Sequence, residues 1–530
     1  MDKFRKYAQT VPITLESWFL AFVGIILVRI FLEQYSGFQF KHFVLIDMPT
    51  LIHYGVFYLA TIIALMVILM FFAKTSLGEV AIVCIFGFFV IWIAPIIDLI
   101  FAGVGGHIMS YLFVPGEELF IRFITFFNWH LVSGITLGIQ IELILGLIFC
   151  YLYVYTATKN IIRAVGAVMV FYIFIFFMVS IPSLIVLFLT PQTSISATIM
   201  QSMVSSNIIA NNIHPSFMST ELGLFNLAFN KLMIGINTVL GIIVVFLFFW
   251  LGAQKKLLAI IKNSRPERLF HFFLLFILGS SLVPTSSFFI GWIDVLSYIL
   301  AFFSFTFAWL FSVCQNDIHD SKIDSVSNPD RPVITQELSK NGMQAASKIF
   351  LLFTFLAAYA SSHYVLFFVS LFLLVYFIYS NPPLRLKRFV IINSFLVGLA
   401  CLSVIMAGFF LVSPDKHIIA FSPGLALAII IFFTAVTNIR DLKDVEGDRA
   451  DGIKTLSILL GVERAKKLIA GTIGLFYLLI PWYFNIPWLI APAVLSTILS
   501  WYFITKKNYK ELPGFVVYML YLILIIGSLL

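Results

Sequence analysis

Two acidic stretches stand out in a chain that is otherwise strongly apolar. The first reads NDIHDSKIDSVSNPDRP over residues 316–332 and places Asp317, Asp320 and Asp324 at i, i+3 and i+7. On a helix this spacing puts the three carboxylates on one face, where Asn316 can add a carbonyl oxygen. Clustered oxygen ligands suit a divalent cation such as Mg2+, which usually shares them with a substrate phosphate. We call residues 316–332 the first acidic motif.

The second acidic motif, residues 438–455, repeats the arrangement as NIRDLKDVEGDRADGIKT. Asp441, Asp444 and Asp448 again stand at i, i+3 and i+7. Carboxylates that face one another repel unless a cation lies between them, so the pair of motifs predicts a Mg2+ site. Arginine and lysine bind phosphate oxygens, so the basic residues around the motifs indicate a diphosphate ligand. These basic residues are Arg331, Arg385, Lys387, Arg388, Arg440 and Lys454.

The composition is that of an integral membrane protein. The chain has 530 residues, of which 61% are hydrophobic and 11% charged, whereas a soluble domain has about 25% charged residues. The net charge is +8, and the basic residues lie in loops between apolar segments. This pattern indicates orientation in a membrane and not nucleic-acid binding. The four cysteines show no pairing or metal-type spacing, so no structural disulfide is expected.

Apolar runs long enough to cross a bilayer recur along the whole chain and predict an all-α multi-pass protein. Six predicted spans precede a basic segment, and nine follow it. We predict an N-terminal transmembrane module of unknown function at 1–254, a basic cytoplasmic linker at 255–268 and a second domain at 269–530. The predicted spans are 13–33, 51–73, 77–101, 131–157, 161–189 and 230–252, then 270–288, 292–314, 343–360, 362–380, 388–411, 418–438, 464–483, 486–504 and 512–529.

The distribution of lysine and arginine predicts the orientation. With a cytoplasmic N-terminus, the basic linker, both acidic motifs and the loop 381–388 all fall on the cytoplasmic side, where positive residues concentrate. On the opposite side of the second half, Lys416 is the only clear basic residue. We therefore expect a protein of the cell membrane with its N-terminus and its active site in the cytoplasm.

The acidic motifs resemble those of a known family. NDxxDxxxD followed by RP, and DxxDxxGDxxxGxxTL, are similar to the two signature motifs of the UbiA superfamily of intramembrane prenyltransferases. The segment YSNPPLRLKR at 379–388 resembles a third segment of the chlorophyll synthase branch. The likeness is greatest to that branch and to the archaeal digeranylgeranylglyceryl phosphate synthases. It implies a nine-helix UbiA-type bundle over residues 265–530.

The resemblance also implies an activity and its residues. Such an enzyme transfers a prenyl group, here of geranylgeranyl type, from a prenyl diphosphate to a polar-lipid or aromatic acceptor in the membrane, with Mg2+ as cofactor and release of diphosphate. The implied metal ligands are Asn316, Asp320, Asp324, Asp444 and Asp448. The four aspartates of that set and Lys387 are the implied catalytic residues. The implied substrate-binding residues are Asn316, Asp317, Arg331, Tyr379, Arg388, Asp441 and Lys454.

A second hypothesis stays open from the sequence: a non-catalytic polyprenyl-lipid binding or transport protein with a prenyltransferase-like half. Residues 1–254 resemble no family that we identify. Within them Glu142 lies inside an apolar run, and an ionisable group in the membrane is a candidate functional residue. Arg29 and Glu33 stand at i and i+4 and are expected to pair near a span end.

Overall fold

The structure is a computed structural model. It describes residues 2–37, 48–102, 111–129, 135–187, 198–199, 201–202, 206, 221–283, 291–321, 324–325, 328–439, 442, 445, 449 and 455–530. Within this part of the chain, thirteen helices are long and apolar enough to cross a membrane, which confirms the predicted all-α multi-pass class. The described residues up to Leu257 form one compact unit and those from Leu258 onward form another.

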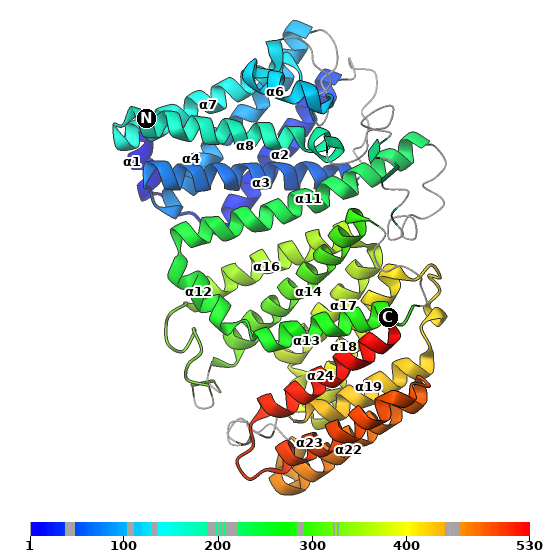
Figure 1. Ribbon diagram of the computed structural model, residues 1–530. Coiled ribbons are helices and arrows are strands. Elements are labelled where there is room, and N and C mark those ends of the chain that lie inside the picture. Colours follow the sequence, from blue (N-terminus) through cyan, green and yellow to red (C-terminus); the bar gives the residue numbers. More distant parts are fainter. Residues whose placement is uncertain are drawn as a thin grey trace. The chain divides into compact units, whose positions relative to one another are not determined.

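In the first unit, each of the six predicted spans contains a helix (Figure 1). α3 is the central helix: it packs against α4, α7, α8 and α11, and 78% of its most apolar window is buried. The elements are α1 (Asp2–Thr10), α2 (Leu15–Gly37), α3 (Met48–Ala73), α4 (Leu77–Phe88), η1 (Phe89–Trp92), α5 (Ile93–Ile97), η2 (Asp98–Ala102), α6 (Gly116–Ile124), η3 (Phe126–Trp129), α7 (Leu137–Thr158), α8 (Ile161–Leu187) and α11 (Glu221–Gly252).

The predicted span 77–101 is not one regular helix. It begins as α4, tightens into the 3-10 segment η1, resumes as α5 and ends in the π-helical turn η2. Irregular backbone within a membrane span is tolerated only where protein groups or a cavity satisfy its polar groups. Here Arg29 of α2 donates to the carbonyl of Ile91. The break therefore lies next to a buried charged side chain.

In the second unit, each of the nine predicted spans also contains a helix. α13 and α19 have only 16 and 15 residues, and the other seven qualify as spans by length and composition. The elements are α12 (Gln254–Asn263), which crosses the boundary between the units, α13 (Pro266–Ser281), α14 (Trp292–His319), α16 (Lys340–Ser361), α17 (His363–Ser380), η5 (Leu386–Arg388), α18 (Val390–Val412), η6 (Ile418–Ala420), α19 (Pro423–Thr437), α21 (Leu456–Leu460), α22 (Val462–Tyr483), η8 (Pro487–Leu489), α23 (Ile490–Thr505) and α24 (Glu511–Leu529).

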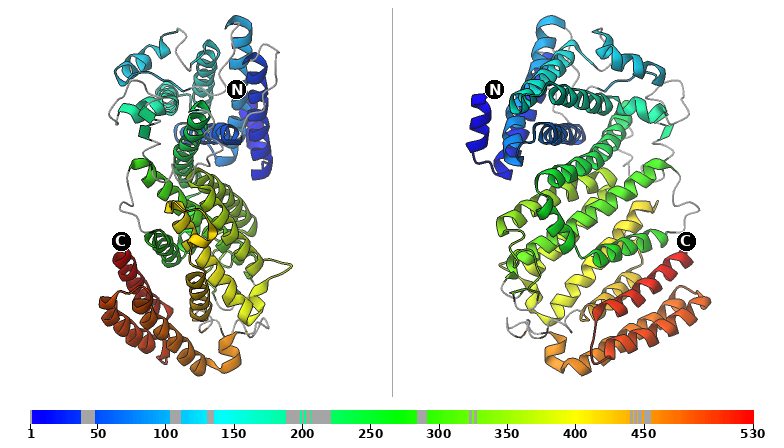
Figure 2. Two further views of the ribbon diagram at one scale, coloured as in Figure 1. Left: turned by 90° about the vertical axis from the view of Figure 1, so that its right-hand side faces the viewer. Right: turned by 60° about the vertical axis from the view of Figure 1, so that its left-hand side comes forward.

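α18 is the central helix of the second unit. It packs against α13, α17 and α19, and 83% of its most apolar window is buried. α22 and α23 form an antiparallel hairpin that packs beside α24 (Figure 2). Aromatic and branched aliphatic side chains fill one continuous core across these helices. This core holds the ends of α14, α17 and α19, where the predicted site residues begin.

Candidate active site

The first acidic motif leaves its helix at Asp320. α14 ends at His319, and the Asp320 amide donates to the Asn316 carbonyl at 2.8 Å as the C-cap, with φ −96°. A further turn follows, in which the Asp324 amide donates to the Asp320 carbonyl at 2.9 Å. α14 therefore ends just before Asp320, but hydrogen bonds of the helical i→i−4 type continue through Asp320 to Asp324.

Asp317 has other hydrogen-bond partners than Asp320 and Asp324. Its carboxylate is 1% exposed and accepts from Asn263 Nδ2 at 2.6 Å, Arg265 Nη2 at 3.3 Å and Arg331 Nη1 at 3.3 Å. Arg331 also donates to Asn263 Oδ1 at 3.1 Å. Both residues were predicted to bind substrate. In this structure they bind each other and Asn263 at the end of α12, and their role toward a substrate stays a prediction.

Asp320 lies between two basic side chains from another segment. Arg385 Nη2 donates to its Oδ1 at 2.8 Å, and Lys387 Nζ donates to its Oδ2. Asp320 and Lys387 are both buried, at 6% and 8% exposure. A buried carboxylate needs such partners, because an unpaired charge in this environment is very costly. Asp320 and Lys387 were both predicted as site residues, and the structure brings them together; Arg385 was predicted only as general positive charge.

Side-chain hydrogen bonds hold the loop 381–388 against the first acidic motif. Ser380 Oγ donates to Asn316 Oδ1 at 3.0 Å, and Asn381 Nδ2 donates to Gln315 Oε1 at 3.1 Å. Arg385 adopts a left-handed conformation, φ 41°, at the turn that precedes η5. That turn brings Lys387 onto the motif. Ser380 and Asn381 lie in the segment 379–388 that resembles the family, but neither was predicted as a site residue.

Asp324 has the features of a metal ligand. Its Oδ1 accepts from Asn328 Nδ2 at 3.0 Å, while its Oδ2 is buried and has no hydrogen-bond partner among the described residues. Burial raises the pKa of Asp324 to about 6, although Arg331 lowers it. A buried carboxylate oxygen without a donor fits a cation, which supplies the missing positive partner. The residues of the first acidic motif therefore fit Mg2+.

Of the remaining predicted site residues, the structure describes Tyr379 and Arg388. Tyr379 is partly buried and packs on Tyr376 with ring centroids 6.2 Å apart. Arg388 is exposed and takes part in no ion pair within the described ranges. In those same ranges, no three His, Cys, Asp or Glu side chains form a metal-binding group. The predictions for Asp441, Asp444, Asp448 and Lys454 lie outside the described residues.

The flanks of the second acidic motif can nevertheless be located. Ser394, in the first turns of α18, donates to Asn438 Oδ1 at 3.1 Å. α18 follows directly on η5, which carries Lys387, the partner of Asp320. Tyr509, in the loop between α23 and α24, donates to the carbonyl of Ile439 at 3.2 Å. The start of the second motif therefore lies at the same end of the bundle as the first.

An apolar cavity extends from this end into the bundle. It comprises about 770 Å³ of empty space, part of it open to the surroundings. Ile439 of the second motif lines the cavity, and Trp309 in its wall lies two turns before Asn316 on α14, while Asp320 and Asp324 are not among the lining residues. The other walls include Arg268, His271, Phe272, Tyr376, Phe432, Phe433, Tyr477, Phe515 and Tyr518. This shape suits a ligand with a polar head and a long apolar body.

Comparison with known proteins gives the family. Residues 281–523 match the UbiA prenyltransferase family. The chain is similar to a chlorophyll synthase of Oryza sativa subsp. japonica, with 29% identity over 32% of this chain and 46% of the rice protein. It is also similar to a digeranylgeranylglyceryl phosphate synthase of Methanoculleus marisnigri, with 29% identity over 28% of this chain and 52% of the archaeal protein. The chain thus spans about half the length of these relatives.

A solved structure is also similar to part of the chain. A UbiA homolog from Archaeoglobus fulgidus bound to GPP and Mg2+ aligns with a TM-score of 0.42 and 19% identity, covering 51% of this chain and 98% of that one.

The helices and the polar cluster at their ends define an integral, multi-pass membrane protein. Its C-terminal half, over residues 281–523, belongs to the UbiA prenyltransferase family. The resemblance predicted from the two acidic motifs is thereby confirmed for that half.

Proposed function

We propose that the C-terminal domain, residues 269–530, transfers a prenyl group of geranylgeranyl type from its diphosphate to a polar-lipid or aromatic acceptor within the membrane. The proposal depends on one observation above all. Asp320 with its two basic partners, and Asp324 with an unpaired buried oxygen, lie at the end of the bundle from which the apolar cavity extends. Acids for a divalent cation, bases for phosphate and an apolar cavity together match a prenyl diphosphate.

The side chains have distinct roles in this proposal. Arg385 and Lys387, which now neutralise Asp320, bind the diphosphate oxygens of the donor and leave Asp320 free to act with Asp324 as a metal ligand. Bound Mg2+ would offset the negative charge of the diphosphate as it departs. Asn316 is held by Ser380 beside this group. The cavity holds the prenyl chain and excludes water from its reactive carbon.

The reaction itself requires little covalent chemistry from the protein. The bond between the first prenyl carbon and the diphosphate oxygen breaks, and its electron pair leaves with the diphosphate. A nucleophilic atom of the acceptor then bonds to that carbon and releases its proton. Tyr376 lines the cavity and Tyr379 packs against it with ring centroids 6.2 Å apart, so an aromatic face is available to the carbon that becomes electron-deficient. Asp441, Asp444, Asp448 and Lys454 are proposed to complete the metal and acceptor sites, as the family resemblance implies.

The test is turnover by the purified full-length protein with labelled geranylgeranyl diphosphate, Mg2+ and a panel of lipid and aromatic acceptors. We expect product formation that EDTA abolishes and excess Mg2+ restores. Asp320→Asn and Asp324→Asn are each expected to lower the rate about 100-fold, the scale of losing one preorganised charged group. Asp330→Asn, an exposed carboxylate in the same loop, is the matched control and should retain the wild-type rate.

Two results would contradict the proposal. Variants at Asp320 and Asp324 as active as the wild type would remove both residues from the mechanism. Saturable binding of labelled geranylgeranyl diphosphate without turnover on any acceptor would favour the alternative, a polyprenyl-lipid binding or transport protein.

A further inference from the structure

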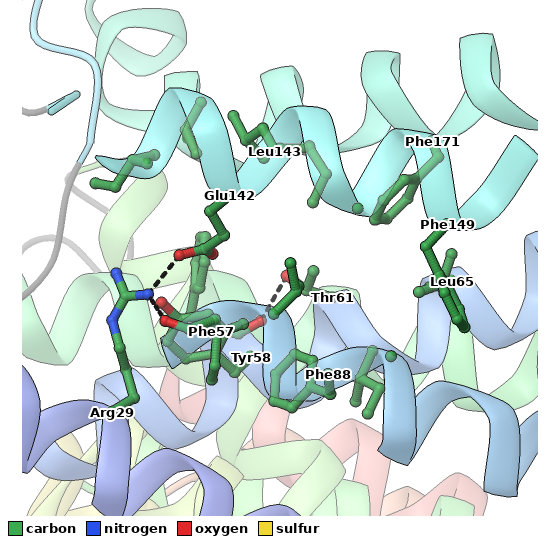
Figure 3. Close-up of a pocket in the computed structure, with 18 of the residues that line it drawn as sticks. Arg29, Phe57, Tyr58, Thr61, Leu65, Phe88, Glu142, Leu143, Phe149 and Phe171 are labelled. Atoms are coloured by element: carbon green, nitrogen blue, oxygen red, sulfur yellow. Dashed lines mark hydrogen bonds and ion pairs between the residues drawn. The ribbon is translucent and has the colours of Figure 1, made fainter. Parts of the chain in front are cut away.

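The first unit contains a cavity that the proposed prenyl transfer does not use. α2, α3, the broken helix 77–102, α7 and α8 surround about 960 Å³ of empty space, part of it open to the surroundings. Figure 3 shows Arg29 and Glu142 at one end of this cavity and Leu65, Phe149 and Phe171 at the other. One end is therefore charged and the other is apolar.

Among the described residues that line the cavity, the charged end carries two carboxylates and one guanidinium. The Arg29 guanidinium donates to the carboxylates of Glu33 and Glu142 and to the carbonyl of Ile91, and Tyr54 donates to Glu33. Arg29 and Glu33 are each 3% exposed. The pair predicted at i and i+4 is present, but Glu142 joins it, so two carboxylates share one guanidinium. An ionisable group in a membrane-spanning helix is costly and marks a functional site by default.

Two polar groups at this end lack partners. Glu142 uses only Oε2 toward Arg29, so within the described part of the chain its Oε1 accepts no hydrogen bond. Tyr58 lines the cavity beside it, and its hydroxyl likewise forms none with a described residue. Asp98, whose carboxylate accepts from Thr136 Oγ1 at 2.6 Å and Gly138 N at 2.8 Å, adds further negative charge on the neighbouring element η2. The unpaired oxygens and the charge excess both call for a positive hydrogen-bond donor.

The backbone at the charged end is also unusual. η1, which contributes Val90 and Ile91 to the cavity wall, is a 3-10 segment within an otherwise α-helical span. Short 3-10 segments inside long helices frequently mark functional positions. In membrane proteins, freed carbonyls at such breaks line ligand and ion sites. The break and the charged cluster are independent features, and they meet at the Ile91 carbonyl.

The other end of the cavity is apolar, so a ligand that fills it needs an apolar body. Tyr58 and Leu65 on α3, and Glu142 and Phe149 on α7, are each seven residues apart, so the cavity extends about 10 Å from the charged end. Gly146 forms part of this wall, and a Cβ added there would meet only Phe171, at 3.9 Å. The space next to Gly146 is therefore open for an apolar chain.

We propose that this cavity binds an amphiphile with a cationic amine head and an apolar body. The ammonium group donates hydrogen bonds to Glu142 Oε1 and the Tyr58 hydroxyl, and it neutralises the excess carboxylate. The chain lies along Leu65, Gly146 and Phe149. A carboxylate or phosphate head would instead face Glu33 and Glu142, and a purely apolar ligand would leave Glu142 unsatisfied.

The test uses the full-length protein in phosphatidylcholine nanodiscs, titrated with decylamine, decanoate and decanol while thermal unfolding is followed. Decylamine is expected to raise the Tm of the wild type saturably, and decanoate is not. Gly146→Leu fills the apolar part of the cavity without touching the charged cluster and should abolish the Tm shift. Gly24→Leu, at an exposed position of α2 with no atom within 4 Å, is the matched control and should retain it.

Glu142→Gln tests the head group and should weaken decylamine binding at least tenfold. Because this substitution also alters the pairing of Arg29, Tyr58→Phe serves as a second variant that leaves the charges unchanged and should also weaken binding. The proposal is overturned if decylamine raises the Tm of Gly146→Leu as much as that of the wild type. It is also overturned if decanoate binds as tightly as decylamine, or if no probe binds saturably. None of these outcomes depends on prenyl transfer.

Discussion

Two aspartates three residues apart in one motif have different environments. Asp320 contacts Arg385 and Lys387 beside the cavity end, whereas Asp317 contacts Asn263, Arg265 and Arg331. The motif alone cannot separate the two, because all of these partners except Arg331 lie more than fifty residues away along the chain. From these contacts we predict that loss of Asp317 acts mainly on stability and that loss of Asp320 acts mainly on the proposed activity.

Asp317→Ala is therefore expected to act mainly on stability. Removing this buried carboxylate leaves Arg331 without its main partner, at a cost of about 3 kcal/mol in the free energy of unfolding. Thermal unfolding of the purified protein measures the loss, with Asp330→Ala as the exposed control. An unchanged Tm together with a large rise in the KM for the donor would instead assign Asp317 to substrate binding.

Lys416 provides a prediction that depends on pH. Its Nζ donates to the Phe410 carbonyl at 2.7 Å and lies 4.9 Å from the centroid of the Tyr364 ring. Burial lowers the pKa of Lys416 from 10.5 to about 8. Between these two values the unfolded chain binds a proton that the folded protein lacks, so folding is stabilised as the pH rises from 8 to 10.5.

The Tm of the wild type should accordingly rise over this pH range relative to Lys416→Met, in which this proton is absent from both states. Lys507→Met, at an exposed position, is the control and should keep the wild-type dependence. The same pH profile for Lys416→Met and the wild type would contradict the prediction.

At the scale of helices, two glycines set the closest crossing in the second unit. A Cβ at Gly279 of α13 would lie 1.9 Å from the Ile405 carbonyl oxygen, and a Cβ at Gly408 of α18 would lie 2.0 Å from that of Phe276. Ser280 Oγ donates across the crossing to the Gly408 carbonyl at 3.1 Å. Small residues allow such close backbone packing between membrane helices.

Gly408→Ala should push α13 and α18 apart and break the Ser280 hydrogen bond. Overpacking of this kind costs about 1–3 kcal/mol, and the loss is measured as a lower Tm. Gly527→Ala is the matched control, since no atom lies within 4 Å of its added Cβ and alanine favours a helix. An equal Tm for both variants would show that the crossing tolerates a wider separation.

The helices also show what sequence patterns can and cannot predict. Hydropathy alone predicted the six spans of the first unit and the nine spans of the second, and each contains a helix among the described residues. It succeeds because a bilayer demands a long apolar run for each span. It missed the break at η1, since Phe89–Trp92 is as apolar as the helices on either side. It also missed Ser380 and Asn381, whose roles come only from the packing of α17 against α14.

At the scale of the molecule, charge is distributed unevenly between the two ends of the second unit. The end with the first acidic motif carries Arg385, Lys387 and Arg388, and Tyr509 brings the loop with Lys506, Lys507 and Lys510 to the same end. The other end of α18 carries Lys416 as its neighbouring basic residue. Basic loops stay in the cytoplasm during insertion, so this asymmetry predicts that the motif end faces the cytoplasm.

Cysteine labelling can test this orientation without altering the native cysteines, because Cys84, Cys150, Cys314 and Cys401 are all buried and form no disulfide with a described residue. A membrane-impermeant maleimide should label Asp415→Cys in intact cells, since Asp415 is exposed at the end opposite the motif. Lys507→Cys should react only after the membrane is permeabilised. Labelling of Lys507→Cys in intact cells, with Asp415→Cys protected, would reverse the orientation and require that the prenyl diphosphate be supplied from outside the cytoplasm.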